Sequence, residues 1–71
     1  MMKLPRRINE FTKPELDMFR ELCNFSEKEL QYFNLKAQDK SIVQIAMEMN
    51  IAEPTVSKLA QKVKAKMIRV L

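Results

Sequence analysis

The sequence of 71 residues contains no glycine, no histidine and no tryptophan, and its only cysteine is Cys23. With no histidine and one cysteine, the chain has no intramolecular disulfide, no cluster of Cys and His metal ligands and no Cys–His nucleophile. Without glycine it has no glycine-rich loop for a phosphate. These absences argue against an enzyme, a metal, a cofactor or a small-molecule ligand. Cys23 is most simply a small core residue.

A long apolar run is also missing. No 18 consecutive residues are apolar, so the sequence predicts no membrane span. The positively charged N-terminal residues are not followed by the apolar segment of a signal peptide. We therefore expect a cytoplasmic protein that does not act at a membrane.

The composition that remains favours an all-α domain. Hydrophobic residues make up 46% of the chain, which is enough for a folded core. The β-branched residues do not alternate with polar ones, as they would in half-buried strands. A chain of this length buries only roughly 60% of its unfolded surface, so helix caps or a partner must help to stabilise it.

The start of a helix is marked three times by the pattern S/T-x-x-E/Q, at Thr12, Ser26 and Ser41. In this capping box the hydroxyl and the Glu or Gln side chain satisfy free N–H groups of the first turn. A fourth helix can begin at Pro54, because a proline is tolerated in the first turn. The predicted fold is a compact four-helix domain over residues 12–71, with helices at about 13–23, 27–38, 42–49 and 54–70. The inward stripe of the first helix is Leu16, Phe19, Leu22 and Cys23.

Residues 41–63 form the stretch around which the domain is organised. The first helix in this stretch places Ile42, Ile45, Ala46 and Met49 on one face. The second repeats this spacing with Val56, Leu59, Ala60 and Val63. Between them Asn50 suits the left-handed conformation that ends a helix. Two helices joined by so short a turn indicate a helix-turn-helix, whose second helix can enter the major groove of DNA.

Charge is distributed unevenly along the chain, whose formal net charge is +4. The net charge is +3 over residues 1–13, −3 over 14–52 and +4 over 53–71. Basic ends around an acidic centre are typical of a nucleic-acid binder, although short basic termini also occur on solvated helices. Residues 1–11 are predicted to form a basic arm. In it Arg6 and Arg7 have no obvious acidic partner and can follow a phosphate backbone or a minor groove, and the alternative is a frayed terminus.

The last helix has a polar, basic face when Val56 points inward. On that face Gln61 can pair with adenine, and Lys58 or Lys62 can reach guanine or phosphate. The helix lacks a capping side chain at Ala52 or Glu53, which leaves its first N–H groups for a phosphate or for water. The alternative for this face is an ordinary solvated surface. The candidate DNA-binding residues are Pro54, Thr55, Ser57, Lys58, Gln61, Lys62 and Arg69, with Ser41, Arg6 and Arg7 outside this helix.

Two groups of apolar residues do not fit a simple monomer. One is Val43 and Met47, on the outer side of the third helix. The other is Ala65, Ile68 and Leu71, which leave the inward stripe near the C-terminus. These residues are candidate contacts with a second copy or with another protein, and scattered apolar residues on a surface are the alternative.

From Phe25 onward the chain resembles the helix-turn-helix of sigma-70 region 4 domains and LuxR-type regulators. The matching segments are FSEKELQYFNL and SIVQIAMEMNIAEPTVSKL. Ile45-Ala46, Ile51 and Thr55-Val56 occupy the characteristic positions of those families. Asp39 and Asn50 stand where glycine is frequent, and Ala52 replaces the usual serine cap.

The resemblance implies a bacterial or phage transcription regulator that binds double-stranded DNA in a sequence-specific way, with residues 53–70 as recognition helix. The helix at 12–23 and the C-terminal segment look more like sigma region 4, because the chain has no room for the further dimerisation helix of LuxR-type proteins. We therefore expect a stand-alone domain or a fragment, and a homodimer is one arrangement it allows. The alternative function is a protein-interaction module that binds RNA polymerase or a sigma factor, as an anti-sigma-like protein or co-regulator, without DNA readout.

Overall fold

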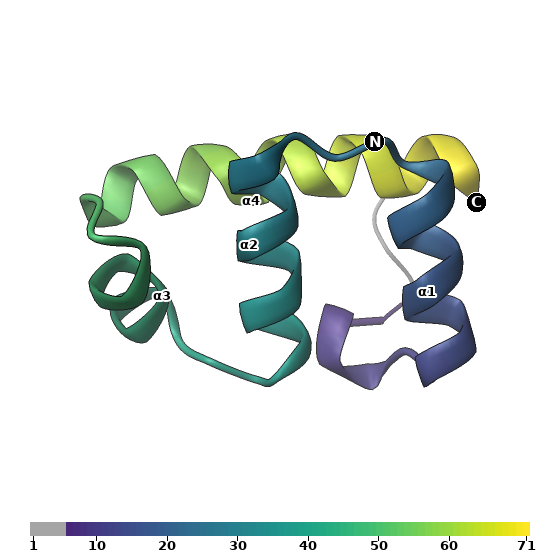
Figure 1. Cartoon of the computed structure of the whole chain (residues 1–71), viewed down its shortest axis with the longest axis horizontal. Coiled ribbons are helices and arrows are strands. Elements are labelled where there is room, and N and C mark those ends of the chain that lie inside the picture. The colour runs from purple at the N-terminus through teal and green to yellow at the C-terminus, as the bar shows by residue number, and fades with distance from the viewer. Residues whose placement is uncertain (1–5) are drawn as a thin grey trace.

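The computed structural model describes residues 6–71, which contain helices and no strand. A short 3-10 turn, η1 (Ile8–Glu10), precedes four α-helices. They are α1 (Lys13–Leu22), α2 (Glu27–Ala37), α3 (Ile42–Met49) and α4 (Glu53–Val70), as Figure 1 shows. The predicted all-α class and the four predicted helices are confirmed, and each helix boundary lies within one residue of the prediction.

All three capping boxes are formed. The hydroxyls of Thr12, Ser26 and Ser41 each accept a hydrogen bond from the backbone N–H three residues later, at 3.2–3.4 Å. The Glu or Gln side chain of each box accepts one in return from the cap residue's N–H at 2.8–2.9 Å. Each box contributes about 1 kcal/mol relative to alanine at the cap.

The helices end without glycine. Asn24, Asp39 and Asn50 take left-handed backbone conformations, with φ of 51°, 61° and 55°. These are the positions at which glycine would otherwise be expected. Asn and Asp are the residue types that tolerate this conformation best, because their short polar side chains can form local hydrogen bonds.

The bundle is built against one side of α4. In Figure 1, α4 runs along the upper edge, and α1, α2 and α3 lie below it. The centre of the core is aromatic on one side, where Phe19 packs edge-on against Phe11 and Phe33 at centroid distances of 5.1 and 6.4 Å. The largest fully buried side chains are Phe19, Phe33, Ile45, Val56, Val63 and Met67. One side of α4 therefore supplies half of these core side chains.

Two residues of the predicted inward stripes are on the surface instead. Leu22 is 58% exposed and Ile42 is 41% exposed. Leu22 is the last residue of α1 and Ile42 is the first of α3. Helical spacing alone predicts that these residues face inward. Each lies at a helix end, where its own helix has no further turn to shield the side chain from solvent.

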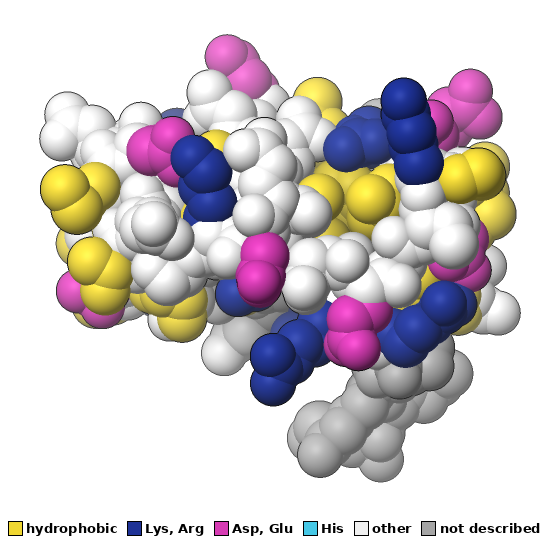
Figure 2. Space-filling view, turned by 90° about the horizontal axis from the view of Figure 1, so that it is seen from below, with side chains coloured by type: hydrophobic (Ala, Val, Ile, Leu, Met, Phe, Trp, Pro, Cys, Tyr) yellow, Lys and Arg dark blue, Asp and Glu magenta, His cyan; other side chains and the backbone are white. Residues whose placement is uncertain are grey.

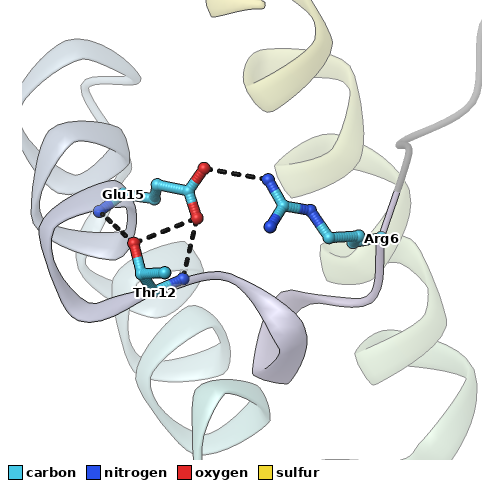
Figure 3. A network of polar contacts seen from close by, with 3 residues as sticks. All are labelled: Arg6, Thr12 and Glu15. Atoms are coloured by element: carbon cyan, nitrogen blue, oxygen red, sulfur yellow. Dashed lines mark hydrogen bonds and ion pairs between the residues drawn. The ribbon is translucent and has the colours of Figure 1, made fainter.

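The N-terminal segment packs on the bundle as far as the structure describes it. Ile8 and Phe11 are buried in the core. The Arg6 guanidinium lies 4.6 Å above the Phe11 ring and forms a 2.9 Å ion pair with Glu15 (Figure 3). The expectation that Arg6 lacks an acidic partner was therefore wrong, because Glu15 is brought to it by the turn at η1. Of the predicted arm, residues 1–5 lie outside the described residues.

Candidate nucleic-acid interface

The turn between α3 and α4 is held by a defined set of backbone hydrogen bonds. Asn50 closes α3 in the left-handed conformation, and the N–H of Ile51 donates to the carbonyl of Ala46 at 3.0 Å. This is the hydrogen bond of a Schellman cap. The half-buried Ile51 packs against the core, so the turn is fixed by apolar contact as well. Ala52 then begins α4 in an extended conformation.

α4 is oriented as the sequence predicts. Val56 and Val63 are fully buried, and Leu59 is nearly so. The candidate DNA-binding residues of this helix are all exposed, and they are Pro54, Thr55, Ser57, Lys58, Gln61, Lys62 and Arg69. The helix thus turns its apolar side to the bundle and its polar side to solvent.

The exposed side of α4 carries charge of nearly one sign. Within the described residues, Lys58, Lys62 and Lys64 form no ion pair, and Glu53 is the only acidic residue of the helix. The lower surface of the bundle differs from this side of α4 in its charge. Figure 2 shows this surface from below, and its basic and acidic side chains are intermixed. The mainly positive exposed side of α4 is therefore the surface that would attract a polyanion.

Lys66 does not belong to this free basic surface. Its Nζ atom forms an ion pair with Glu29, the acidic residue of the α2 capping box, and donates to the Asn24 carbonyl at 3.2 Å. Glu29 is only 5% exposed. The hydrogen bond from Lys66 and that from the Ser26 N–H lower the pKa of the Glu29 carboxyl. Sequence reasoning counted Lys66 among the terminal basic residues, and no local signal pairs it with Glu29.

The predicted DNA-binding residues outside the first turns of α4 are Ser41, Arg69, Arg6 and Arg7, and they lie in different parts of the bundle. Ser41 is exposed at the start of α3 and caps it. Arg69 is 11 residues after Lys58, roughly 16 Å further along the helix. Arg6 and Arg7 border η1, at the lower edge of Figure 1, whereas α4 runs along the upper edge. They therefore lie across the bundle from the exposed side of α4.

The start of α4 has no side-chain cap, as expected. Ala52 cannot accept a hydrogen bond with its side chain, and Pro54 occupies the first turn. Four of the five residues in the two apolar groups predicted to face outward are exposed. Met47 is 76% exposed and Leu71 is 57% exposed. Val43 and Ala65 are exposed as well, and Ile68 is half-buried.

No group of three or more His, Cys, Asp and Glu side chains that could hold a metal ion occurs within residues 6–71. Cys23 is buried, and this burial raises the pKa of its thiol. In the same part of the chain, no helix has the length and hydropathy needed to cross a membrane.

These features define a helix-turn-helix domain with an exposed basic second helix. The family model for bacterial regulatory proteins of the luxR family matches residues 23–68, about two-thirds of the chain. The chain belongs to this family, whose helix-turn-helix domains are DNA-binding transcription regulators rather than enzymes. The match starts at the end of α1 and covers α2, α3 and nearly all of α4. Among curated proteins and among solved structures no match was found.

Proposed function

We propose that this chain binds double-stranded DNA in a sequence-specific way and regulates transcription, with α4 as its recognition helix. The observation that carries the proposal is the division of α4 into a buried apolar side and an exposed basic side. We call residues 53–62, the N-terminal turns of α4, the reading turns. They are the part of α4 that follows the helix-turn-helix corner.

In the proposed complex the reading turns lie in the major groove. Gln61 is placed to form two hydrogen bonds with adenine, and Lys58 to donate to guanine O6 and N7. Thr55 and Ser57 are short, so the helix can approach the DNA closely. Lys62 and Lys64 flank these side chains and bind phosphates, which fixes the orientation of the helix on the duplex.

In this proposal the start of α3 and the start of α4 contact the phosphate backbone of the DNA on either side of the helix-turn-helix corner. α3 lies across the phosphate backbone, with Ser41 at its exposed end. The N–H groups of the first turn of α4 have no side-chain cap and can donate to a phosphate oxygen, which the helix dipole favours. The proposed contact surface consists of α4 and the start of α3, without Arg6 and Arg7, because the bundle separates them from α4.

The experiment is a selection of bound sites from random duplex DNA, followed by titrations of the selected and a scrambled duplex at several salt concentrations. We expect a site enriched at a few adjacent base pairs. If Lys62 and Lys64 neutralise two phosphates per copy, log K falls against log salt with a slope of about −1.8 for one bound copy. Failure to bind any duplex at about 50 mM salt, with retention of an RNA polymerase or sigma subunit, would instead support the protein-interaction module.

A further inference from the structure

Glu53 is the one acidic side chain on α4, whose exposed side is otherwise basic or uncharged. It is the first residue of the helix and is exposed, and within the described residues it forms no ion pair. A carboxylate beside a duplex repels the phosphates of every sequence, because they carry the same charge. The proposed reading turns therefore contain one side chain that lowers the general affinity for DNA.

We infer that Glu53 recognises a cytosine, by accepting a hydrogen bond from the N4 amino group of that base in the major groove. This inference rests on the proposed DNA binding and adds one base to the target site. It is supported by the position of Glu53 relative to Gln61, by the rigid start of α4 and by the chemistry of the four base edges.

Glu53 lies on the same stripe of α4 as two other exposed side chains of the reading turns. Ser57 and Gln61 follow it at intervals of four residues. Each interval turns the side-chain direction by only about 40°, so Glu53 and Gln61 point about 80° apart. They are about 12 Å apart along the helix, which is roughly 3.5 base-pair steps of about 3.4 Å. A major groove in which Gln61 contacts adenine is therefore within reach of Glu53.

The start of α4 holds Glu53 in a fixed place. The N–H groups of Thr55 and Val56 both donate to the carbonyl of Ala52, at 3.0 and 3.2 Å, and Val56 is fully buried. Pro54, the next residue, has a restricted backbone. Only the side-chain torsions of Glu53 remain to be ordered on binding. The carboxylate also projects from the side of the helix, whereas the first N–H groups point along its axis. A phosphate at these N–H groups is therefore compatible with a base at Glu53.

Cytosine is the base whose major-groove edge suits a carboxylate best. An ionised carboxylate can only accept hydrogen bonds. Cytosine presents its N4 donor and no acceptor, whereas guanine presents two acceptors and thymine presents one. Adenine presents a donor beside the acceptor N7, so it suits a carboxylate less well than cytosine. Guanine or thymine would leave the carboxylate without a partner beside the bases, and this penalty adds to the repulsion by phosphates.

A glutamate at the start of a helix also stabilises that helix through its dipole, and Glu27 allows the two roles to be separated. Glu27 is the first residue of α2, as Glu53 is of α4, and it is likewise exposed and in no ion pair among the described residues. The ion pair between Glu29 and Lys66 places the start of α2 beside the second half of α4. A role limited to the dipole would make Glu27 and Glu53 equivalent, whereas base recognition belongs to Glu53 alone.

The test begins with the site selected from random duplex DNA. We expect it to contain a cytosine within about four base pairs of the adenine whose preference Gln61→Ala removes. Titrations then compare four duplexes that carry each of the four bases at the cytosine position. The wild-type protein should bind the cytosine duplex at least 10-fold more tightly than those with guanine or thymine, with adenine in between. A selected site without a cytosine in this range would overturn the inference.

Glu53→Ala should change these affinities in opposite directions. It should weaken binding to the cytosine duplex, which loses a hydrogen bond, and strengthen binding to the guanine and thymine duplexes, which lose a repulsion. Glu53→Gln keeps the shape of the side chain and should move the preference from cytosine to adenine, because an amide can pair with N6 and N7 of adenine. This second variant also covers the case that Glu53→Ala does not fold.

Glu27→Ala is the matched control, because it removes the same charge from the first residue of another helix. It should leave the ratios among the four affinities unchanged. Equal strengthening of all four by Glu53→Ala would show that Glu53 acts only by repulsion and would overturn the inference. Failure of the wild-type protein to bind any duplex would overturn the proposed DNA binding itself, whereas binding with a base preference that Glu53→Ala and Glu53→Gln leave unchanged would overturn only the role of Glu53.

Discussion

Lys66 near the end of α4 forms an ion pair with Glu29 of the α2 capping box, although the two residues lie 37 residues apart in the sequence. The same Glu29 oxygen accepts a 2.8 Å hydrogen bond from the Ser26 N–H. One carboxylate thus stabilises the start of α2 and fixes α4 against it. This links the position of α4 to the capping box of another helix.

We expect Glu29→Gln to lower the stability and to flatten its dependence on pH. Glutamine can keep the cap but removes the charge that pairs with Lys66, which should cost about 2 kcal/mol at pH 7. For a domain of this size that corresponds to a fall in Tm of about 10 °C. Circular dichroism melts of both proteins at pH 7 measure it.

The pH dependence follows from the direction of the Glu29 shift. Its pKa is lowered in the folded state, chiefly by the hydrogen bond from Lys66. The stability that it contributes is therefore present above its unfolded pKa and is lost as the pH falls through the lower folded pKa. The wild-type Tm should fall more steeply than that of Glu29→Gln below about pH 4.3. Parallel curves for the two proteins would contradict this.

Gln61→Ala should reduce specificity more than affinity for DNA in general. A glutamine that pairs with adenine contributes to the selected site and not to other sequences, so the loss should be about 1–3 kcal/mol on that site alone. Titrations of the selected and scrambled duplexes measure both quantities. Lys64→Ala is the matched control on the same helix. It should weaken binding equally on both duplexes and make the salt slope shallower by about 0.9.

The sequence predicts best what is decided within a few residues. The capping boxes at Thr12, Ser26 and Ser41 bring their partners within three residues, and the left-handed ends at Asn24, Asp39 and Asn50 need no partner at all. The exposed side of α4 follows equally well from helical spacing.

The features that the sequence does not predict are contacts between segments that lie far apart in the chain. Lys66 was counted only in the basic charge of the C-terminal segment, because its partner Glu29 lies in α2, two helices earlier in the chain. The Arg6–Glu15 pair likewise needs the turn at η1. Leu22 and Ile42 fit their helical stripes, but the neighbouring helices decide whether a residue at a helix end is covered.

Cys23 should react with a thiol reagent only when the domain opens. The thiol is buried, and burial raises its pKa, so the reactive thiolate is scarce in the folded state. We expect the rate of modification by a maleimide at pH 7 to rise at least 100-fold in denaturing urea. Because it is the only cysteine, one label per chain reports the fraction opened. Similar rates in the folded and unfolded states would show that the end of α1 is not packed as described.

The uncapped start of α4 allows the proposed phosphate contact to be tested with two related substitutions. Ala52 has the extended backbone of an N-cap residue but no side-chain acceptor. Ala52→Ser and Ala52→Asp both supply one, so each should stabilise the free domain by about 1 kcal/mol and raise its Tm. Their effects on DNA should differ. Aspartate places a negative charge where a phosphate is proposed to lie, so its affinity for the selected duplex should fall by at least 10-fold, whereas serine should change it much less. If both variants are stabilised and bind DNA equally well, the first turn of α4 does not face a phosphate, and the helix must enter the groove by a later turn.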